Sequence, residues 1–528
     1  MKKIFVVTVL LFEMAAACAQ TDDASKYASV ITAADLQKHL TIIASDEMEG
    51  RETGTDGQRK AATYIESQFK AIGLQIPTGM TGYQQFYPLH KDTMLSSSLK
   101  IADYTAEYGT DYIIPRANAS GTFTSNDIVF AGYGIEDEKY NDYTGLNVTG
   151  KLVIIFLGEP KSDGIFLISG KSSGSDWTYP GLSKKITLSA NKGAAGVLVI
   201  NPSTENFSKR SIEDSKHSNI YYPAESNGIE DKNVNFALIT HQFAKTLFAD
   251  RFDAIIKKAK ASEPFSQSDA WNKNESSSYG YEKKTKIIYA SNVLGMIEGT
   301  DKKDEYVFLS AHYDHLGKHD GKIYYGADDD GSGTVGVIEM ATAFAKAKAE
   351  GKGPRRTLIF MTVSGEEKGL WGSQYYSDHP IFPLDKTSVD LNTDMVGRID
   401  TERKTADTTN YVYVVGHDKI SSDLPVINEA VNNKYTLLKL DYKFDDPKDP
   451  ERIYYRSDHY NFARKGVPVL FFYDGMLKAD YHKPTDTVEK INWALYEKRV
   501  RMIFYTAWEI ANRKKMLKRN KPLPSETR

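Results

Sequence analysis

The C-terminal half of the chain alternates between two kinds of segment, and this alternation limits the possible folds more than any other feature. After Lys284, short runs of β-branched and aromatic residues alternate with segments whose apolar residues recur at helical spacing. Such an order predicts an α/β domain with a mostly parallel central sheet flanked by helices. Strands are predicted at 290–298, 306–311, 357–363, 389–393, 411–415 and 467–473, and helices at 333–349, 370–377, 424–433, 460–465 and 493–515.

The first part of the chain has a different character. Residues 34–74 show helical spacing with a glycine-rich interruption, and Gly73 is placed to end the second helix. Short strands around one helical piece are predicted between 117 and 264, with linkers near Pro115 and at 262–278. We therefore expect a β-rich domain at 116–265, inserted into a larger domain made of residues 20–115 and 266–515, and a basic tail at 516–528.

The overall composition excludes some partners. The chain has 528 residues, enough for more than one domain, and its formal net charge of −3 gives no reason to expect nucleic acid binding. Cys18 is the only cysteine, so no intramolecular disulfide can form. The fold must therefore rely on burial of an apolar core.

The N-terminus has the pattern of an export signal. Two lysines precede the apolar run 4–12, and small residues lead to a cleavage point after Ala19. We expect residues 1–19 to be a signal peptide, which is too short to span a membrane. Cys18 could instead carry a lipid anchor, but Ala15 is a weak match to the branched apolar residue usual in lipoprotein signals. The expected location is periplasmic, secreted or lipoprotein-anchored in a bacterial envelope.

A cluster of histidine and aspartate follows one of the predicted strands. His312, Asp314 and His315 come directly after the strand at 306–311, and three consecutive aspartates at 328–330 precede a helix start. Imidazole and carboxylate groups at a strand end, beside a helix start, form the ligand set of a zinc site with oxygen character. A polar loop whose aspartates cap the helix is an equally good explanation of this cluster alone.

Four further polar clusters lie at strand ends or in nearby loops. Glu366 and Glu367 follow one strand and Asp394 follows the next, while Arg456 precedes the last strand and His482 follows it. Singly, each has a simpler explanation as a helix cap or a surface residue. Five clusters at successive strand ends are hard to explain in that way, because ligands bind at the carboxyl ends of parallel strands.

The motifs AHYDHLG, GADDDGSG, SGEEKGLWGS, LNTDMVG and YHKPTDT resemble, in order and spacing, those of the di-zinc aminopeptidases. The same superfamily includes glutamate carboxypeptidase and the glutaminyl cyclases. The resemblance covers the N-terminal segment SDEMEGRETGTDGQRKAATYI and everything from about Lys284 onward, and it implies that residues 266–515 form the catalytic peptidase domain. The inserted segment, including NKGAAGVLVINP, is similar to a protease-associated domain.

The resemblance implies a ligand set for two zinc ions per chain. His312 and Asp394 would hold one ion, Glu367 and His482 would hold the other, and Asp329 would bridge both. Zinc at a catalytic site keeps a position open for water or substrate, and this set leaves room for one. Manganese or cobalt could occupy the same ligands in vitro.

The resemblance also implies roles for residues around the metals. Glu366 would be the general base, and Asp314 would accept the second ring N–H of the ligand His312. Tyr481 matches a tyrosine that donates to the reacting carbonyl oxygen in some members of the family. Arg456 matches an arginine near the substrate in some members.

Other polar residues of these motifs are expected to serve local structure. The five matched ligands already complete both metal sites, so His315 and His459 are expected to hold their loops rather than a metal. Asp328 and Asp330 are expected to form hydrogen bonds within their own loop.

We expect the chain to be an exported aminopeptidase that hydrolyses the N-terminal peptide bond of peptides. Two zinc ions can share a hydroxide, polarise the scissile carbonyl and hold the oxyanion, while the uncoordinated Glu366 takes and returns the proton. Glutaminyl cyclisation and release of a C-terminal glutamate on the same scaffold are open alternatives. A non-catalytic binding protein is disfavoured because no ligand position is missing. The sequence does not indicate the oligomeric state.

Overall fold

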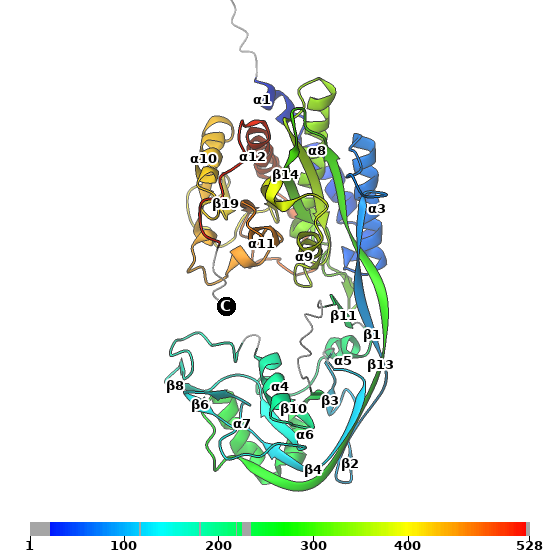
Figure 1. Cartoon of the computed structure of the whole chain (residues 1–528), viewed down its shortest axis with the longest axis vertical. Coiled ribbons are helices and arrows are strands. Elements are labelled where there is room, and N and C mark those ends of the chain that lie inside the picture. Colours follow the sequence, from blue (N-terminus) through cyan, green and yellow to red (C-terminus); the bar gives the residue numbers. More distant parts are fainter. Residues whose placement is uncertain (1–21, 116–117, 179–180, 218, 224–233, 524–528) are drawn as a thin grey trace, which may run out of the picture. The chain divides into compact units, whose positions relative to one another are not determined.

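The computed structural model describes residues 22–523 apart from 116–117, 179–180, 218 and 224–233. These residues form two compact units (Figure 1). Unit 1 comprises the described residues up to Tyr87 and those from Ala290 onward, and unit 2 runs from Pro88 to Tyr289. Two long strands, β1 (Gln84–Ile101) and β13 (Trp271–Ile297), have residues in both units. The expected signal peptide and Cys18 lie outside the described residues.

The central sheet of unit 1 is mostly parallel. Strands β14, β17, β18 and β21 pair in parallel, and the antiparallel strands β13 and β19 flank them. This confirms the predicted α/β fold, and it places the carboxyl ends of the four parallel strands at one edge. The strand order is β20 (Lys439–Asp441), β19 (Tyr411–Val415), β21 (Val469–Tyr473), β18 (Thr387–Thr393), β14 (Lys302–His312), β17 (Arg356–Val363) and β13.

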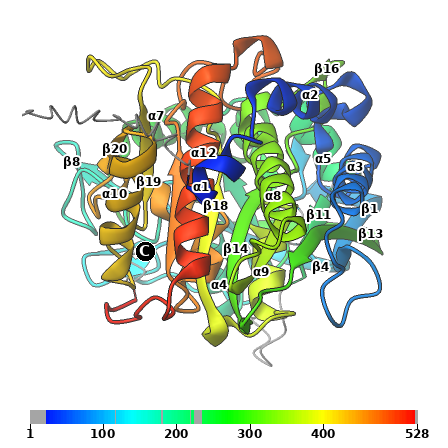
Figure 2. The same ribbon diagram turned by 90° about the horizontal axis from the view of Figure 1, so that it is seen from above.

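The helices that cover this sheet are the ones that the apolar spacing predicts. Strands β17, β18 and β21 are buried along their whole length, as in sheets covered on both faces. Helices α8 (Gly333–Ala349) and α12 (Trp493–Asn512) lie side by side over β14, β17 and β18 (Figure 2). Helix α11 (His459–Ala463) packs on β18 and β21 and against α9 (Trp371–Asp378), and α10 (Asp423–Tyr435) packs on α12.

The first helices of the chain belong to unit 1 and pack on α8. They are α1 (Asp23–Ala28), α2 (Ala33–Ile43) and α3 (Asp56–Ile72). Thr32 caps α2 by accepting a backbone N–H, and Gly73 ends α3 in the left-handed conformation (φ 84°) that glycine adopts without strain. The predicted helical pair at 34–74 is therefore confirmed. No helix in the described ranges is both long and apolar enough to cross a bilayer.

Unit 2 has its own set of parallel strands and its own core. Strands β4, β7, β10 and β12 pair in parallel, with β3 antiparallel at one edge and β13 antiparallel at the other. The strands predicted here are present, whereas the sequence patterns did not predict α5, α6 and α7. The bounds are β3 (Tyr112–Ile113), β4 (Gly121–Phe130), β7 (Leu152–Phe156), α4 (Leu182–Asn191), β10 (Gly196–Ile200), α5 (Lys209–His217), β12 (Phe236–Ile239), α6 (His241–Phe248) and α7 (Phe252–Ala261).

The segment 262–278, expected to be a linker, is partly strand. From Trp271 onward it belongs to β13, which pairs antiparallel with β4 as far as Tyr281. Its Ser- and Asn-rich sequence is poor in β-branched residues, so cross-strand pairing rather than local preference places it in a sheet. The long strand β1, which pairs with β13, was not predicted for the same reason.

Candidate metal centre and active site

The predicted ligands lie at the edge of the sheet where its parallel strands end. Strand β14 ends at His312, which pairs in register with Val363, the last residue of β17. The loop after β17 carries Glu366 and Glu367, and Asp394 follows β18 directly. Because these strands run in the same direction, their polar extensions meet at one place.

Two groups of ligand atoms share one aspartate. His312 Nε2 lies 3.3 Å from Asp329 Oδ1 and 3.5 Å from Asp394 Oδ1. His482 Nε2 lies 3.0 Å from Glu367 Oε2 and 3.3 Å from Asp329 Oδ2. Asp329 thus offers one oxygen to each group. The structure brings together all five residues that the sequence resemblance marks as ligands.

The two neighbours of Asp329 hold the surrounding loops. Asp330 accepts the backbone N–H of Met395 at 3.1 Å, and Asp328 accepts that of Gly397 at 2.8 Å. Both carboxylates thus bind the backbone of the loop after β18, and they also accept the expected hydrogen bonds within their own loop. The peptide bond between Asp329 and Asp330 is cis. The side chain of Asp329 alone faces the two ligand groups.

Two residues that the sequence analysis did not predict form hydrogen bonds to the proposed ligands or to their backbone. Asp486 accepts the backbone N–H groups of Asp328 and Asp329 at 3.0 and 3.1 Å. Ser457 donates to Asp394 Oδ2 at 2.7 Å. Their positions in the sequence could have indicated them. Asp486 lies in the same YHKPTDT motif as His482, and Ser457 directly follows Arg456.

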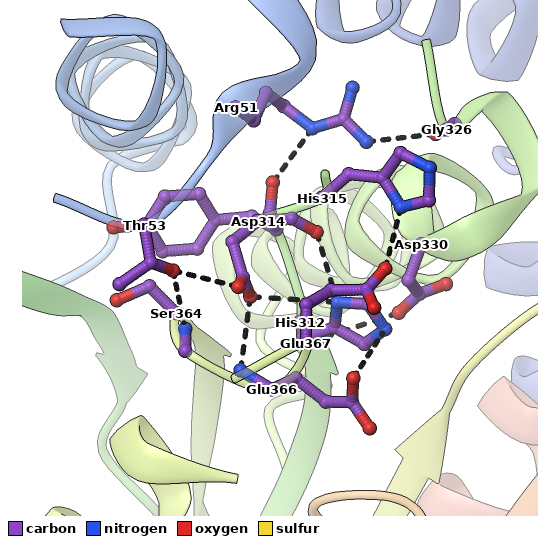
Figure 3. A network of polar contacts seen from close by, with 12 residues as sticks. Arg51, Thr53, His312, Asp314, His315, Gly326, Asp330, Ser364, Glu366 and Glu367 are labelled. Carbon is purple, nitrogen blue, oxygen red and sulfur yellow. Dashed lines mark hydrogen bonds and ion pairs between the residues drawn. The ribbon is translucent and has the colours of Figure 1, made fainter. Parts of the chain in front are cut away.

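Asp314 contacts His312 through a different atom from the one expected. His312 Nδ1 lies 3.1 Å from the backbone carbonyl oxygen of Asp314 and 3.6 Å from its carboxylate Oδ1. The carboxylate instead accepts the Thr53 hydroxyl at 2.7 Å and the backbone N–H of Glu366 at 3.2 Å (Figure 3). The main chain of Asp314 thus orients the imidazole, while its side chain holds the loop that carries Glu366.

A segment near the N-terminus braces this site, and it too was missed. Thr53 is buried, and its hydroxyl oxygen accepts the backbone N–H of Gly365 at 2.9 Å. Arg51 is fully buried and donates to the backbone carbonyls of Tyr313 and Gly326 at 2.7 and 2.8 Å (Figure 3). These bonds join the segment to the loops that carry the ligands. The motif EGRETG contains both residues, but nothing local in it indicates which loops they contact.

The adjacent glutamates lie in different surroundings. Both oxygens of Glu367 are occupied, Oε1 by His315 Nδ1 at 2.6 Å and Oε2 by His482. Glu366 Oε2 lies 3.9 Å from His312 Nε2, and Glu366 lines a pocket. Burial raises the pKa of Glu366 well above its usual value. Burial and Asp329 also act to raise the pKa of Glu367, but the neighbouring imidazoles outweigh them and lower it.

The pocket beside the metal ligands is small, about 30 Å³ in volume. Arg456 and Tyr481 line it together with the apolar side chains of Ile453, Phe471 and Leu477. Arg456 Nη2 donates to the Tyr481 hydroxyl oxygen at 3.1 Å. The two residues that were predicted to contact the substrate, Arg456 and Tyr481, therefore line the same pocket. Apolar side chains form much of the rest of its lining.

The charges and the buried atoms of the site suit a metal cation. His312 Nε2 and Asp329 Oδ2 are buried, and within the described ranges neither has a hydrogen-bond partner. Burial lowers the pKa of His482, but Asp329 and Glu367 outweigh it and raise the pKa to about 10. The site therefore attracts positive charge, and its nitrogen and oxygen donors are those that zinc binds.

A second acidic group, elsewhere in unit 1, does not share these properties. His417, Asp418 and Asp445 also lie close enough together to hold a cation. However, Lys419 Nζ contacts Asp445 Oδ1, so this group already has its own positive charge. Asp418 is exposed, and the group serves below only as a control.

The comparisons with known proteins show which family part of the chain resembles. Residues 292–507 match the family described as Peptidase family M28. This part of the chain, less than half of its length, is therefore similar to a family of peptidases. The matched range holds every predicted ligand, but it excludes Arg51 and Thr53.

The relatives are aminopeptidases and a protease. A probable leucine aminopeptidase of Trichophyton verrucosum is 29% identical over 215 residues, which cover 40% of this chain and 55% of the relative. A vacuolar membrane protease of Saccharomyces cerevisiae is 30% identical over 190 residues, covering 35% of this chain and 18% of that protein. The chain thus spans about half the length of the leucine aminopeptidase, and less of the yeast protein.

Solved structures show the same fold over almost the whole chain. An aminopeptidase from Aneurinibacillus sp. has a TM-score of 0.55 at 18% identity, covering 95% of this chain and 98% of its own. A zinc aminopeptidase from Bacillus subtilis has a TM-score of 0.52 at 17% identity, covering 93% and 99%. At these identities the likeness shows the fold alone.

The expected location in a bacterial envelope is wrong. The curated relatives named above are fungal, and one is a protease of the vacuolar membrane. An apolar run after a charged start is common to export signals of many kinds of cell, so the pattern could not distinguish among them.

Zinc should stabilise the folded protein. When zinc is added to chelator-treated protein, the midpoint of thermal unfolding should rise, because a ligand at 100 times its Kd that binds only the folded state contributes about 2.7 kcal/mol. Asp329→Asn should lose most of this shift, since Asp329 serves both ligand groups, while Asp418→Asn should keep it. An equal zinc-induced shift in both variants would contradict the assignment of the metal centre.

Removing the Thr53 hydroxyl should destabilise the protein. Thr53→Val leaves an oxygen of Asp314 and the backbone N–H of Gly365 buried without this partner, at a cost of about 1–3 kcal/mol. Thr53→Ser keeps the hydroxyl and should remain close to the parent. Thr63→Val, on the exposed face of α3, is the matched control and should change little. The measurement is the midpoint of unfolding, and equal values for the Val and Ser variants at position 53 would refute the bracing role.

Proposed function

We propose that this chain is a zinc-dependent aminopeptidase that removes the first residue of peptides. The observation that carries the proposal is the contrast between two adjacent glutamates. Glu367 is fixed among the ligand groups, and Glu366 faces the pocket beside them. Cleavage at the amino end is supported by the names of the relatives, among them a leucine aminopeptidase.

Two zinc ions would be held by the two groups of ligand atoms. His312 and Asp394 would hold the first, Glu367 and His482 the second, and Asp329 would bridge them. Bound zinc supplies Lewis acidity, which polarises a carbonyl and makes a water molecule easier to deprotonate.

Glu366 would act as the general base. It lines the pocket with Asp329 and Asp394, so a water molecule and a scissile carbonyl placed there are within its reach. Its carboxylate would take the proton of the attacking water and deliver it to the leaving amine. The backbone N–H of Glu366 is held by Asp314, which Thr53 in turn holds, so the base is carried on a braced loop.

Tyr481 would donate to the reacting carbonyl oxygen. Because Arg456 donates to the Tyr481 hydroxyl oxygen, the tyrosine proton points away from Arg456. That proton would stabilise negative charge as it develops on the carbonyl oxygen of the substrate. The apolar side chains that line the pocket would contact the first residue of the substrate.

Unit 2 is, in the same proposal, a protease-associated domain inserted into the peptidase domain, with residues 116–265 as its expected range. Two observations support this. The sequence of this region is similar to such domains, and unit 1 resumes at Ala290 after an interruption that starts at Pro88. Its role would be to restrict which substrates are cleaved.

A peptide panel tests the direction of cleavage. Peptides with free and acetylated amino ends, with N-terminal Gln and with C-terminal Glu are incubated with the protein, with and without chelator, and followed by mass spectrometry. Loss of one N-terminal residue from free-amine peptides alone, abolished by chelator, is expected. Release of Glu from acetylated peptides would indicate a carboxypeptidase instead, and pyroglutamate formation without hydrolysis a cyclase.

The two glutamates should respond differently to the same substitution. Glu366→Gln should keep the zinc content of the parent and lower kcat about 10²–10⁴-fold, the usual contribution of a general base. Glu367→Gln should lower the affinity for zinc. Zinc content is measured by atomic absorption and kcat with an aminoacyl p-nitroanilide. Full activity in Glu366→Gln would rule out the proposed mechanism.

A further inference from the structure

His315 is a third histidine beside the metal ligands, and it is completely buried. Its Nδ1 lies 2.6 Å from Glu367 Oε1 (Figure 3) and 3.9 Å from Asp329 Oδ2. Its other ring nitrogen, Nε2, is buried and has no hydrogen-bond partner in the described part of the chain. The contact with Glu367 is therefore the polar contact that fixes this ring.

The backbone of Gly326 lies directly against the His315 ring. A Cβ on Gly326 would lie 2.5 Å from His315 Cγ and 2.6 Å from Cδ2, so only glycine allows the ring to sit here. Gly326 is itself held through its carbonyl by the buried Arg51, which also donates to the Tyr325 carbonyl at 2.7 Å. The imidazole thus packs closely against the backbone of Gly326, and its Nδ1 faces Glu367.

The short contact between His315 and Glu367 requires a hydrogen between the two atoms. A ring nitrogen and a carboxylate oxygen 2.6 Å apart would repel each other unless a hydrogen lies between them. His315, Asp329 and Glu367 are also close enough together to hold a cation. We assign the hydrogen to Nδ1 of His315, because Glu367 has to be deprotonated to serve as a metal ligand, and Nδ1 then donates to Oε1 and offers no lone pair to a metal. Glu367 Oε2, on the other side of the carboxylate, lies 3.0 Å from His482 Nε2. The two oxygens of Glu367 are thus divided between two imidazoles.

We propose that His315 is a positioning residue for Glu367: it holds one carboxylate oxygen so that only the other, Oε2, is offered to the metal that His482 binds. The proposal rests on the zinc sites proposed above. It replaces the expectation that His315 serves only its own loop. Since residues that orient metal ligands typically contribute 10–100-fold to metal affinity, the effect should be measurable in the protein without substrate.

Two variants of equal size separate the donor from the shape of the side chain. His315→Asn places an amide N–H near the position of Nδ1, whereas His315→Leu fills the same space without a donor. His482→Asn removes a proposed ligand and serves as the contrast. His241→Asn replaces a buried histidine of unit 2 and controls for the substitution itself. Zinc stoichiometry is measured by atomic absorption, and zinc affinity by competition with a chromogenic chelator.

The expected result is that His315→Leu binds as many zinc ions per chain as the parent but releases one of them 10–100-fold more readily. His315→Asn should recover most of that affinity, and His482→Asn should lose one ion. The proposal is overturned if both variants at 315 lose one ion, which would make His315 a ligand. It is also overturned if His315→Leu binds zinc as the parent does, or if Asn fails to improve on Leu. If the Leu variant does not fold, parental zinc content and affinity in His315→Asn support the proposal, and loss of one ion overturns it.

None of these readouts requires hydrolysis. If no peptide of the panel is cleaved while zinc binding responds as expected, the aminopeptidase assignment fails and the role of His315 stands. If peptides are cleaved while zinc binding is unchanged in His315→Leu, the aminopeptidase assignment stands and the proposed role of His315 fails.

Discussion

Negative charge buried at one edge of a parallel sheet is the constraint on which the rest of unit 1 depends. Asp329 and Asp394 are 3% and 7% exposed, and the side chains of Glu366 and Glu367 are 11% and 3% exposed. Buried carboxylates are costly unless they are paired with positive charge and held by hydrogen bonds. The loops at this edge meet that requirement with imidazoles, with backbone N–H groups and, in our proposal, with zinc.

The sequence predicted most of the secondary structure of unit 1 and the ligands of its site. The strands of the parallel sheet are continuous apolar runs, so their pattern needs no tertiary context. His312, Glu367 and Asp394 stand at or shortly after the end of such a run, and Asp329 and His482 lie in loops whose motifs can be recognised. By contrast, β13 is held in its sheet by its neighbours, and its Ser-rich first half carries no local signal.

The residues that could not be predicted act across long distances in the sequence. The role of Thr53 depends on a contact with Asp314, which no local pattern encodes. His315 was assigned to its loop because the ligand count was already complete, and only the distance to Glu367 indicates otherwise. The predicted location in a bacterial envelope was wrong for another reason. It rested on residues 1–19, whose pattern does not identify the kind of cell.

The contact between Arg51 and the Tyr313 carbonyl joins residues that are 262 positions apart. Between them in the sequence lies all of unit 2, whose strands and core are complete within a continuous stretch. During synthesis, unit 2 can therefore fold while the first helices of unit 1 still wait for the strands they will cover. The brace of the site can close once the residues from Tyr313 to Gly365 have been synthesised, whereas the proposed metal ligand His482 follows more than 100 residues later, so the two parts of the site are completed at different times.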